Sequence, residues 1–235
     1  MADQLHPIVF LSLGPGDPGL LTQTAVGILK EADVVMVPAT RDHEGGLSSR
    51  ATDIIREWCD ASRLRAYELP MLKDRRAVLT VYDSLCRDAG LLYRQKRRVV
   101  VAAEGDVSIY ASIHYVMDRL RAEGIPVVQQ PGIPSFIAAA AVAGMSLVSQ
   151  HQRLTILPGD ADVPTLQHLL ANGHVVVVMK LSQCQDALKA FLRGNAKAQC
   201  HYFEHIGTER EFHTTERQEI LSRPVPYFSL CVLSE

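Results

Sequence analysis

The stretch LSLGPGDPGLLT (Leu11–Thr22) lies near the start of the 235-residue chain, between an apolar run and a helical pattern. Its glycines Gly14, Gly16 and Gly19 fit the spacing G-x-G-x-x-G of a dinucleotide-binding loop. Such a loop binds pyrophosphate through backbone N–H groups at a helix N-terminus. The stretch therefore raises the question of which ligand, if any, this loop binds.

The residues between the glycines argue against NAD. Pro15 and Pro18 have no backbone N–H, and Asp17 places a carboxylate where the phosphate charge would lie. The next apolar run, VVMVPA (Val34–Ala39), ends without the acidic residue that would bind the ribose. The loop is acidic and poor in donors, which favours a neutral or cationic ligand. A simple strand-to-helix turn is the alternative.

Composition narrows the class of protein. A formal charge of −2 gives no field that would attract nucleic acid or an anionic membrane. The nearly apolar run Phe136–Val148 is too short to span a bilayer, and the first residues lack the basic segment of a signal peptide. Five cysteines without a C-x-x-C spacing predict free thiols and a cytoplasmic location. His201 and His205 do not have zinc spacing, so no metal site is expected.

Apolar β-branched runs alternate with helical patterns, which predicts an α/β fold. Runs such as RRVVVAA and VVVVMK are apolar on both faces, which favours buried and mainly parallel strands. The expected strands are Ile8–Leu13, Val34–Val37, Arg65–Leu69, Arg98–Ala103, Val127–Gln129, Leu154–Leu157, Val175–Met179, Ala198–Glu204 and Tyr227–Leu233. The expected helices are Thr22–Glu31, Arg50–Cys59, Arg75–Gln95, Ile109–Glu123, Ser135–Ala143, Pro164–Ala171 and Gln183–Leu192.

The strict alternation of strand and helix ends near Gly124-Ile125-Pro126. Beyond it, the C-terminal stretches resemble neighbouring strands joined by short loops. We therefore expect two α/β lobes, residues 1–124 and 125–235, with the ligand cleft between them.

Two more stretches are candidates for a site. EGDVSIY (Glu104–Tyr110) follows an apolar strand, at the end where α/β proteins bind ligands. Asp106 could also cap the helix that begins near Ser108. In QQPGIPSFIAAAA (Gln129–Ala141) the small side chains would let a flat ligand approach, or would allow tight helix packing.

Taken in chain order, these stretches resemble the tetrapyrrole (precorrin) methyltransferases of cobalamin biosynthesis. GPGDPGLLTQTAVGILKEADVV is similar to the opening signature of the family, EGDVSIY to its second and PGIPSFIAAAAVAGMSL to its third. VVVVMKL, FEHIGTEREF and PYFSLCVL fall where the C-terminal lobe has its matching pieces. Among subfamilies, the stretches are most similar to enzymes that methylate C-20 of precorrin-2 or cobalt-factor II.

The resemblance implies a homodimer of two-lobed α/β subunits that binds S-adenosylmethionine and a tetrapyrrole, and releases S-adenosylhomocysteine. A sulfonium cation without phosphate suits the acidic, donor-poor loop. By position, the implied cofactor contacts are Pro15, Glu104, Gly105, Asp106, Ile109, Tyr110, Pro134, Ser135, Phe136, Met179, Lys180, Phe203, Glu204, His205, Pro226 and Tyr227. The chain departs from the family at Val107, where Pro is usual, and at Pro134, where Ser or Thr is common.

The implied reaction is methyl transfer to a meso carbon, accelerated mainly by positioning. Asp17, Asp106 or solvent could take the proton that the methylated carbon loses, and these alternatives stay open. Arginines are the expected partners of the substrate carboxylates, with ordinary surface charge as the alternative. The candidates are Arg41, Arg50, Arg75 and Arg76. Competing functions are methylation of another tetrapyrrole carbon, diphthine-type protein methylation, and a non-catalytic nucleotide-binding regulator.

Overall fold

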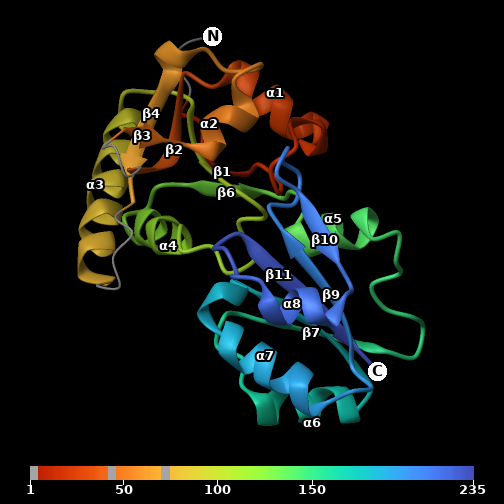
Figure 1. Ribbon diagram of the computed structural model, residues 1–235. Helices are drawn as coiled ribbons and strands as arrows, with labels where there is room; N and C mark the ends of the chain where they lie inside the picture. The colour runs from red at the N-terminus through yellow and green to blue at the C-terminus, as the bar shows by residue number, and fades with distance from the viewer. Residues whose placement is uncertain (1–4, 42–45, 70–74) are drawn as a thin grey trace. The chain divides into compact units, whose positions relative to one another are not determined.

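The computed structural model describes residues 5–41, 46–69 and 75–235, with the side chains of 75–77 left out. Backbone contacts divide the chain into two units, Met1–Pro134 and Ser135–Glu235. Each unit is a sheet with helices, which confirms the prediction of two α/β lobes (Figure 1). The division falls later than the expected boundary after residue 124, because strand β6 (Val127–Gln130) pairs with β1 (Ile8–Ser12) of the first sheet.

The first unit is built around a largely parallel sheet with the strand order β3-β2-β5-β1-β6, in which β4 also pairs with β2. Among the described residues, the β2–β3 pair is the antiparallel one. Besides β1 and β6, its elements are η1 (Pro18–Leu20), α1 (Gln23–Glu31), β2 (Val34–Arg41), β3 (Leu47–Ser48), α2 (Arg50–Ile55), η2 (Ala61–Arg63), β4 (Leu64–Glu68), α3 (Arg75–Arg94), β5 (Val99–Ala103) and α4 (His114–Ala122).

Helices cover both faces of this sheet because β1 and β5 are apolar on both sides. Phe10 of β1 packs in one cluster with residues of α3 and α4, such as Leu85 and Met117. Leu11, the next residue, packs in the other cluster with residues of α1 and α2, such as Leu29. The alternation follows from the period of two in a strand.

Strands β1 and β5 are neighbours in register, yet their connections diverge. The chain leaves β1 through α1 and reaches β2 on one side, whereas it leaves β5 through α4 and reaches β6 on the other side. The carboxyl ends of β1 and β5 therefore form a topological switch point, where open α/β sheets bind their ligands.

The second unit has a sheet with the strand order β10-β9-β11-β8-β7. Its elements are α5 (Ser135–Val142), β7 (Arg153–Leu157), α6 (Val163–Ala171), β8 (His174–Met179), η3 (Leu181–Gln183), α7 (Gln185–Gly194), β9 (Gln199–Glu204), β10 (Phe212–Thr214), α8 (Arg217–Ser222) and β11 (Ser229–Ser234). The helices α6, α7 and α8 pack against one face of the sheet (Figure 1).

The expectation of mainly parallel strands is wrong for this second sheet. Strand β8 pairs with β7 in parallel, but β11 returns between β8 and β9 and is antiparallel to both, and β9 and β10 are also antiparallel. The run VVVVM of β8 is apolar on both faces because it lies between β7 and β11 inside the sheet, with Val175–Val178 buried.

All five cysteines are free and buried, in agreement with the prediction of reduced thiols. In the described part of the chain, no helix combines the length and apolar character that crossing a membrane requires.

Candidate functional site

The loops after β1 and β5 are joined to each other at the switch point. The N–H of Gly14 donates to the carbonyl of Gly105 at 3.0 Å, and the N–H of Gly105 donates to the carbonyl of Gly14 at 2.7 Å. Both glycines have a positive φ, +74° and +72°, that residues with a side chain rarely adopt. Two glycines of the sequence motifs therefore serve the shape of the backbone.

The loop after β6 joins the same structure. The N–H of Gly132 donates to Oδ2 of Asp106 at 2.8 Å. A Cβ on Gly132 would lie only 2.5 Å from the Cβ of Ser12, at the end of β1. The glycine is thus required by the close approach of two neighbouring strand ends.

Asp106 is the centre of this arrangement, with a relative exposure of 8%. Its Oδ1 accepts hydrogen bonds from the backbone N–H of Ser108 at 2.8 Å and from the Ser108 hydroxyl. Its Oδ2 is 3.5 Å from the hydroxyl of Ser12, which itself accepts from the N–H of Val107 at 3.0 Å. Asp106 therefore fixes the turn after β5 to the ends of β1 and β6.

The hydrogen bonds decide the charge of Asp106. Burial alone would raise the pKa of the carboxyl, but the bonds from Gly132, Ser108 and Ser12 outweigh it and lower the pKa. The sequence predicted a helix cap here, and Asp106 does cap the turn at Ser108. The following helix begins later than expected, at His114.

Glu104 differs from Asp106 in its surroundings. Its Oε2 lies 3.5 Å from Nε of Arg50, with the two side chains 26% and 20% exposed. Arg50 begins α2 and also donates to the carbonyl of Pro15 at 3.1 Å. Burial raises the pKa of Glu104, nearby Arg50 opposes the rise and Asp53 adds to it. Arg50, predicted to bind substrate, thus connects the opening loop to Glu104.

Asp17 is exposed and takes part in a local turn. Its Oδ1 accepts from the N–H of Gly19 at 2.7 Å and caps η1. Farther along, Ile109 is half-buried, whereas Tyr110 is 41% exposed with a φ of +49°. The structure thus places Asp17 at the surface of the opening loop.

The other predicted arginines lie on different elements. Arg41, at the end of β2, makes two hydrogen bonds of 2.8 Å to the carboxylate of Glu68 and is exposed. Arg75 and Arg76 begin α3, and their side chains lie outside the described residues.

In the second unit, the predicted residues gather at one edge of the sheet. Met179 of β8 and Phe203 of β9 are both in register with Leu230 of β11. Lys180 and His205 follow these strands directly, and both are in the left-handed region, with φ of 53° and 49°. The two strand ends therefore turn sharply at the same edge.

Glu204 is buried at this edge, and both of its carboxylate oxygens accept hydrogen bonds. Its carboxylate accepts from the Tyr202 hydroxyl at 2.7 Å and from Nε and Nη2 of Arg223 at 2.7 and 3.2 Å. The Arg223 guanidinium lies 3.8 Å from the centre of the Phe212 ring. Burial would raise the pKa of Glu204, but the bonds from Arg223 and Tyr202 lower it.

Three of the predicted residues line one pocket of about 400 Å³ beside the Glu204–Arg223 pair. Its lining consists of Glu204, His205, Arg223, Pro224, Val225 and Pro226. Tyr227 follows the pocket residue Pro226 in the chain. Its side chain is exposed, and its ring packs edge to face on that of Phe228, with ring centres 5.0 Å apart.

The remaining predicted residues lie where the two units meet in the sequence. Pro134 ends the first unit, and Ser135 begins both the second unit and α5. Phe136 is buried in α5 together with Ala138, Ala139 and Ala140.

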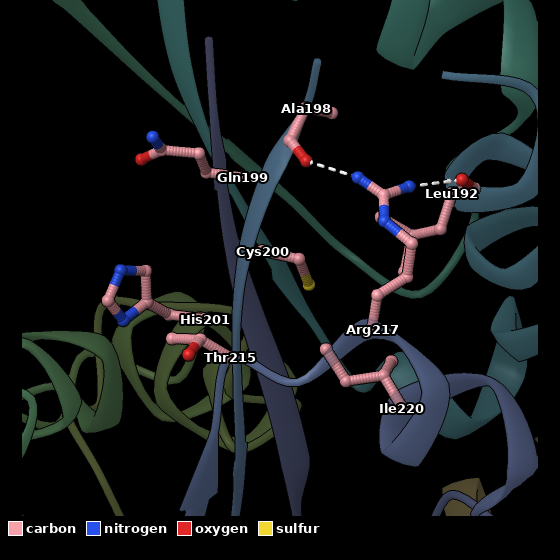
Figure 2. A pocket seen from close by; sticks show the side chains of 8 residues that line it. All are labelled: Leu192, Ala198, Gln199, Cys200, His201, Thr215, Arg217 and Ile220. Atoms are coloured by element: carbon pink, nitrogen blue, oxygen red, sulfur yellow. Dashed lines mark hydrogen bonds between the residues drawn. The ribbon is translucent and has the colours of Figure 1, made fainter. Parts of the chain in front are cut away.

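A separate pocket of about 360 Å³ in the second unit has Arg217 among the residues that line it (Figure 2). The Arg217 guanidinium donates to the carbonyls of Leu192, Asn195 and Ala198, the last at 2.6 Å. These carbonyls lie at and after the end of α7, where a cation is favourable. Among the described residues, no group of three or more metal-ligating side chains is present.

Sequence reasoning missed Ser12, Arg223 and Tyr202. Ser12 gave a weak signal, as a polar residue at the end of an apolar strand. Arg223 gave none, because it follows α8 and its partner Glu204 ends β9, 19 positions earlier in the chain.

The groups around the switch point suit a cationic ligand better than a phosphate. Pro15 and Pro18 supply no N–H, and the Gly14 and Gly105 N–H groups are used between the loops. Asp17 supplies an exposed carboxylate, and the carboxylate of Glu104 is paired with Arg50. This set of groups fits the sulfonium of S-adenosylmethionine.

Fold and loops together define an α/β protein of two units whose candidate ligand loops lie at a topological switch point. The sequence pattern of the family described as Tetrapyrrole (Corrin/Porphyrin) Methylases matches residues 7–220. The chain belongs to this family, which confirms the resemblance seen in the sequence.

Relatives in the family carry related names. The chain is 28% identical to a precorrin-2 C(20)-methyltransferase of Sinorhizobium sp, over 96% of this chain and 94% of that protein. It is 27% identical to the cobalt-precorrin-2 C(20)-methyltransferase of Salmonella typhimurium, with the same coverage.

Solved structures share the fold. A uroporphyrin-III C-methyltransferase from Thermus thermophilus, complexed with S-adenosylhomocysteine, matches with a TM-score of 0.69 at 21% identity, over 97% of both chains. A cobalt precorrin-4 methyltransferase matches with a TM-score of 0.68 at 18% identity, over 96% of this chain and 94% of the other. S-adenosylmethionine, the cofactor expected from the sequence, is the methyl donor of the family.

Proposed function

We propose that the protein transfers a methyl group from S-adenosylmethionine to C-20 of precorrin-2 or cobalt-factor II in cobalamin biosynthesis. Two relatives with this named position align with nearly the whole chain, at 27–28% identity. The stretch EGDVSIY and the ending PYFSLCVL support the same subfamily.

One observation carries the proposal: acceptor-bearing loops are locked together at the switch point of the first sheet. Hydrogen bonds between Gly14 and Gly105 and around Asp106 fix the shape of these loops. S-adenosylmethionine supplies a methyl group on a positively charged sulfur, which is a good leaving group. A rigid frame of this kind favours the reaction by orienting the reactants.

We assign the cofactor contacts to residues of both units. In the first, Pro15, Gly105, Ile109 and Tyr110 would border the cofactor, with Pro134 at the end of the unit. In the second, we assign the cofactor contacts to Ser135, Phe136, Met179, Lys180, Phe203, Glu204, His205, Pro226 and Tyr227. Arg41, Arg50, Arg75 and Arg76 are the proposed partners of the substrate carboxylates. Of these, Arg41 pairs with Glu68 and Arg50 with Glu104, so each would exchange or share that partner when substrate binds.

Product analysis tests the proposal. The protein is incubated with precorrin-2 and, separately, with cobalt-factor II, together with S-adenosylmethionine labelled in the methyl group. NMR then locates the new methyl. We expect it on C-20, and a methyl on another carbon, or none, would contradict the proposal. Calorimetry with S-adenosylhomocysteine is the companion measurement. The absence of binding would contradict any S-adenosylmethionine-dependent methyl transfer by this protein.

We further propose a homodimer, and a cytoplasmic location in keeping with the five reduced cysteines. Sedimentation equilibrium measures the first, and fractionation of the cells of origin measures the second. A monomer at micromolar concentration would contradict the homodimer.

A further inference from the structure

We propose that Glu104 accepts the proton that the meso carbon of the substrate releases after methylation. The inference rests on the proposed function and adds a role that differs from cofactor contact. Three acidic residues of the first unit stand near the switch point: Asp17, Glu104 and Asp106. Their hydrogen bonds and burial separate them.

Asp106 is poorly suited to accept a proton. Both of its carboxylate oxygens accept hydrogen bonds from the protein, including those from Gly132 and Ser108 at 2.8 Å. Protonation would disrupt this arrangement and release the three loops that it holds. A carboxylate stabilised in this way is a weak base.

Asp17 is poorly suited for a different reason. Its Oδ1 accepts the hydrogen bond that caps η1, and its side chain is exposed. An exposed carboxylate is accessible to water, and that of Asp17 is already engaged in the local turn.

Glu104 has the properties that the other two lack. It directly follows β5, at the switch point, and its side chain is only 26% exposed. Within the described part of the chain, no hydrogen bond reaches its carboxylate, and its Oε2 lies 3.5 Å from Nε of Arg50 in the ion pair. Both oxygens therefore retain the capacity to accept a proton, and burial strengthens the group as a base.

Arg50 gives the carboxylate a fixed position. Its Nη2 is bound to the carbonyl of Pro15 at 3.1 Å, so the guanidinium lies between the opening loop and Glu104. The groups that act on Glu104 come from separate elements: Arg50 and Asp53 from α2, and Tyr67 from β4, whose phenol is close enough for charge interaction. The ion pair would hold the carboxylate in place until it accepts the proton, and would form again when the proton passes to solvent.

The step balances in atoms and charge. An electron pair of the ring forms the new carbon–methyl bond while the methyl–sulfur bond breaks, and its electrons stay on sulfur. The meso carbon then carries both hydrogen and methyl, and the ring has gained one positive charge. The carbon–hydrogen bond breaks, its electron pair returns to the ring, and the proton moves to an oxygen of Glu104 and then to solvent.

Glu104→Gln in the full chain tests the proposal, because it keeps the size of the side chain and removes the base. Glu31→Gln is the matched control, since Glu31 is exposed and pairs with Arg98 at 3.0 Å on the opposite edge of the sheet. Three quantities are measured: binding of S-adenosylhomocysteine by calorimetry, the turnover number at saturating substrate, and the isotope effect with substrate deuterated at the meso carbon.

We expect Glu104→Gln to bind S-adenosylhomocysteine like the unchanged protein and to lose about 100-fold or more in turnover, as general-base loss does. A primary isotope effect should appear in this variant, since proton release becomes limiting. Glu104→Asp should recover part of the rate, and Glu31→Gln should change none of the three quantities.

Two results would overturn the role of Glu104. One is unchanged turnover in Glu104→Gln, and the other is a loss of S-adenosylhomocysteine binding with no isotope effect, which would make Glu104 a binding residue. If the unchanged protein itself forms no methylated product, the proposed function has failed instead, so the two failures are distinguishable.

Discussion

Asp106→Asn is the most direct test of how the loops of the first unit are held. The wild-type carboxylate accepts from Gly132 on one oxygen and from Ser108 on the other, both at 2.8 Å. An amide has one oxygen and one NH₂ group, so in either orientation the NH₂ faces a backbone N–H. The substitution therefore replaces one hydrogen bond with a contact between two donors.

The magnitude follows from the burial of the group. A hydrogen bond to a charged partner contributes about 1.5–3 kcal/mol, and a buried donor without a partner costs about 1–3 kcal/mol. The two effects overlap, because they concern the same site. We expect Asp106→Asn to lower the free energy of unfolding of the first unit by roughly 2–4 kcal/mol.

The effect must also depend on pH. The pKa of Asp106 is lower in the folded protein than in the unfolded chain, so its contribution is fully present above the unfolded value of about 3.9. The contribution is lost as the pH falls through the lower, folded value. The difference between the two proteins should therefore be constant near neutral pH and should narrow below about pH 4.

Urea unfolding followed by tryptophan fluorescence is a suitable assay. The chain has a single tryptophan, Trp58, which packs against the core on the α1 and α2 side of the first sheet. The midpoint should fall while the slope with urea stays the same. An unchanged midpoint would refute the reasoning. If binding of S-adenosylhomocysteine were weaker at the same time, the carboxylate would be a ligand group instead.

Further predictions concern two glycines, one arginine and a pair of histidines. Gly132→Ala should destabilise by about 1–3 kcal/mol, because the new Cβ would lie 2.5 Å from the Cβ of a serine. Gly27 lies in α1 with no atom near the position of a Cβ, so Gly27→Ala should raise the free energy of unfolding by about 0.5–1 kcal/mol. Equal urea midpoints for Gly132→Ala and Gly27→Ala would contradict these two predictions. Arg217→Met should lower thermal stability by about 2 kcal/mol, because it removes the hydrogen bonds that close the end of α7, and an unaltered melting temperature would count against that role. Nδ1 of His201 lies 3.2 Å from Nε2 of His213, and burial lowers the pKa of both imidazoles. The unfolded chain therefore binds more protons than the folded protein as the pH falls, so the free energy of unfolding should rise between about pH 5 and 7. Replacing both histidines by Gln should flatten this rise, and an unchanged slope would exclude them as its source.

Local pattern was sufficient for most elements of the fold. The apolar runs of β1, β2, β5 and β8 predicted strands within a few residues of their observed bounds, because a strand or helix repeats over a short distance. The direction of pairing in the second sheet could not be predicted in this way. A run that is apolar on both faces is buried on both faces, whether its neighbours are parallel or antiparallel.

The sequence by itself determined the family, two α/β units, and a donor-poor loop suited to a cation. Only the tertiary structure decided what the individual polar residues do. Asp106 and Glu104 are two positions apart in the same motif, yet one is saturated by Gly132, Ser108 and Ser12 and the other is not. Ser108 is a local partner, but Ser12 and Gly132 lie at the ends of strands that are distant in the chain and adjacent in the sheet. The charge and reactivity of each carboxyl therefore depend on contacts that the order of residues does not specify.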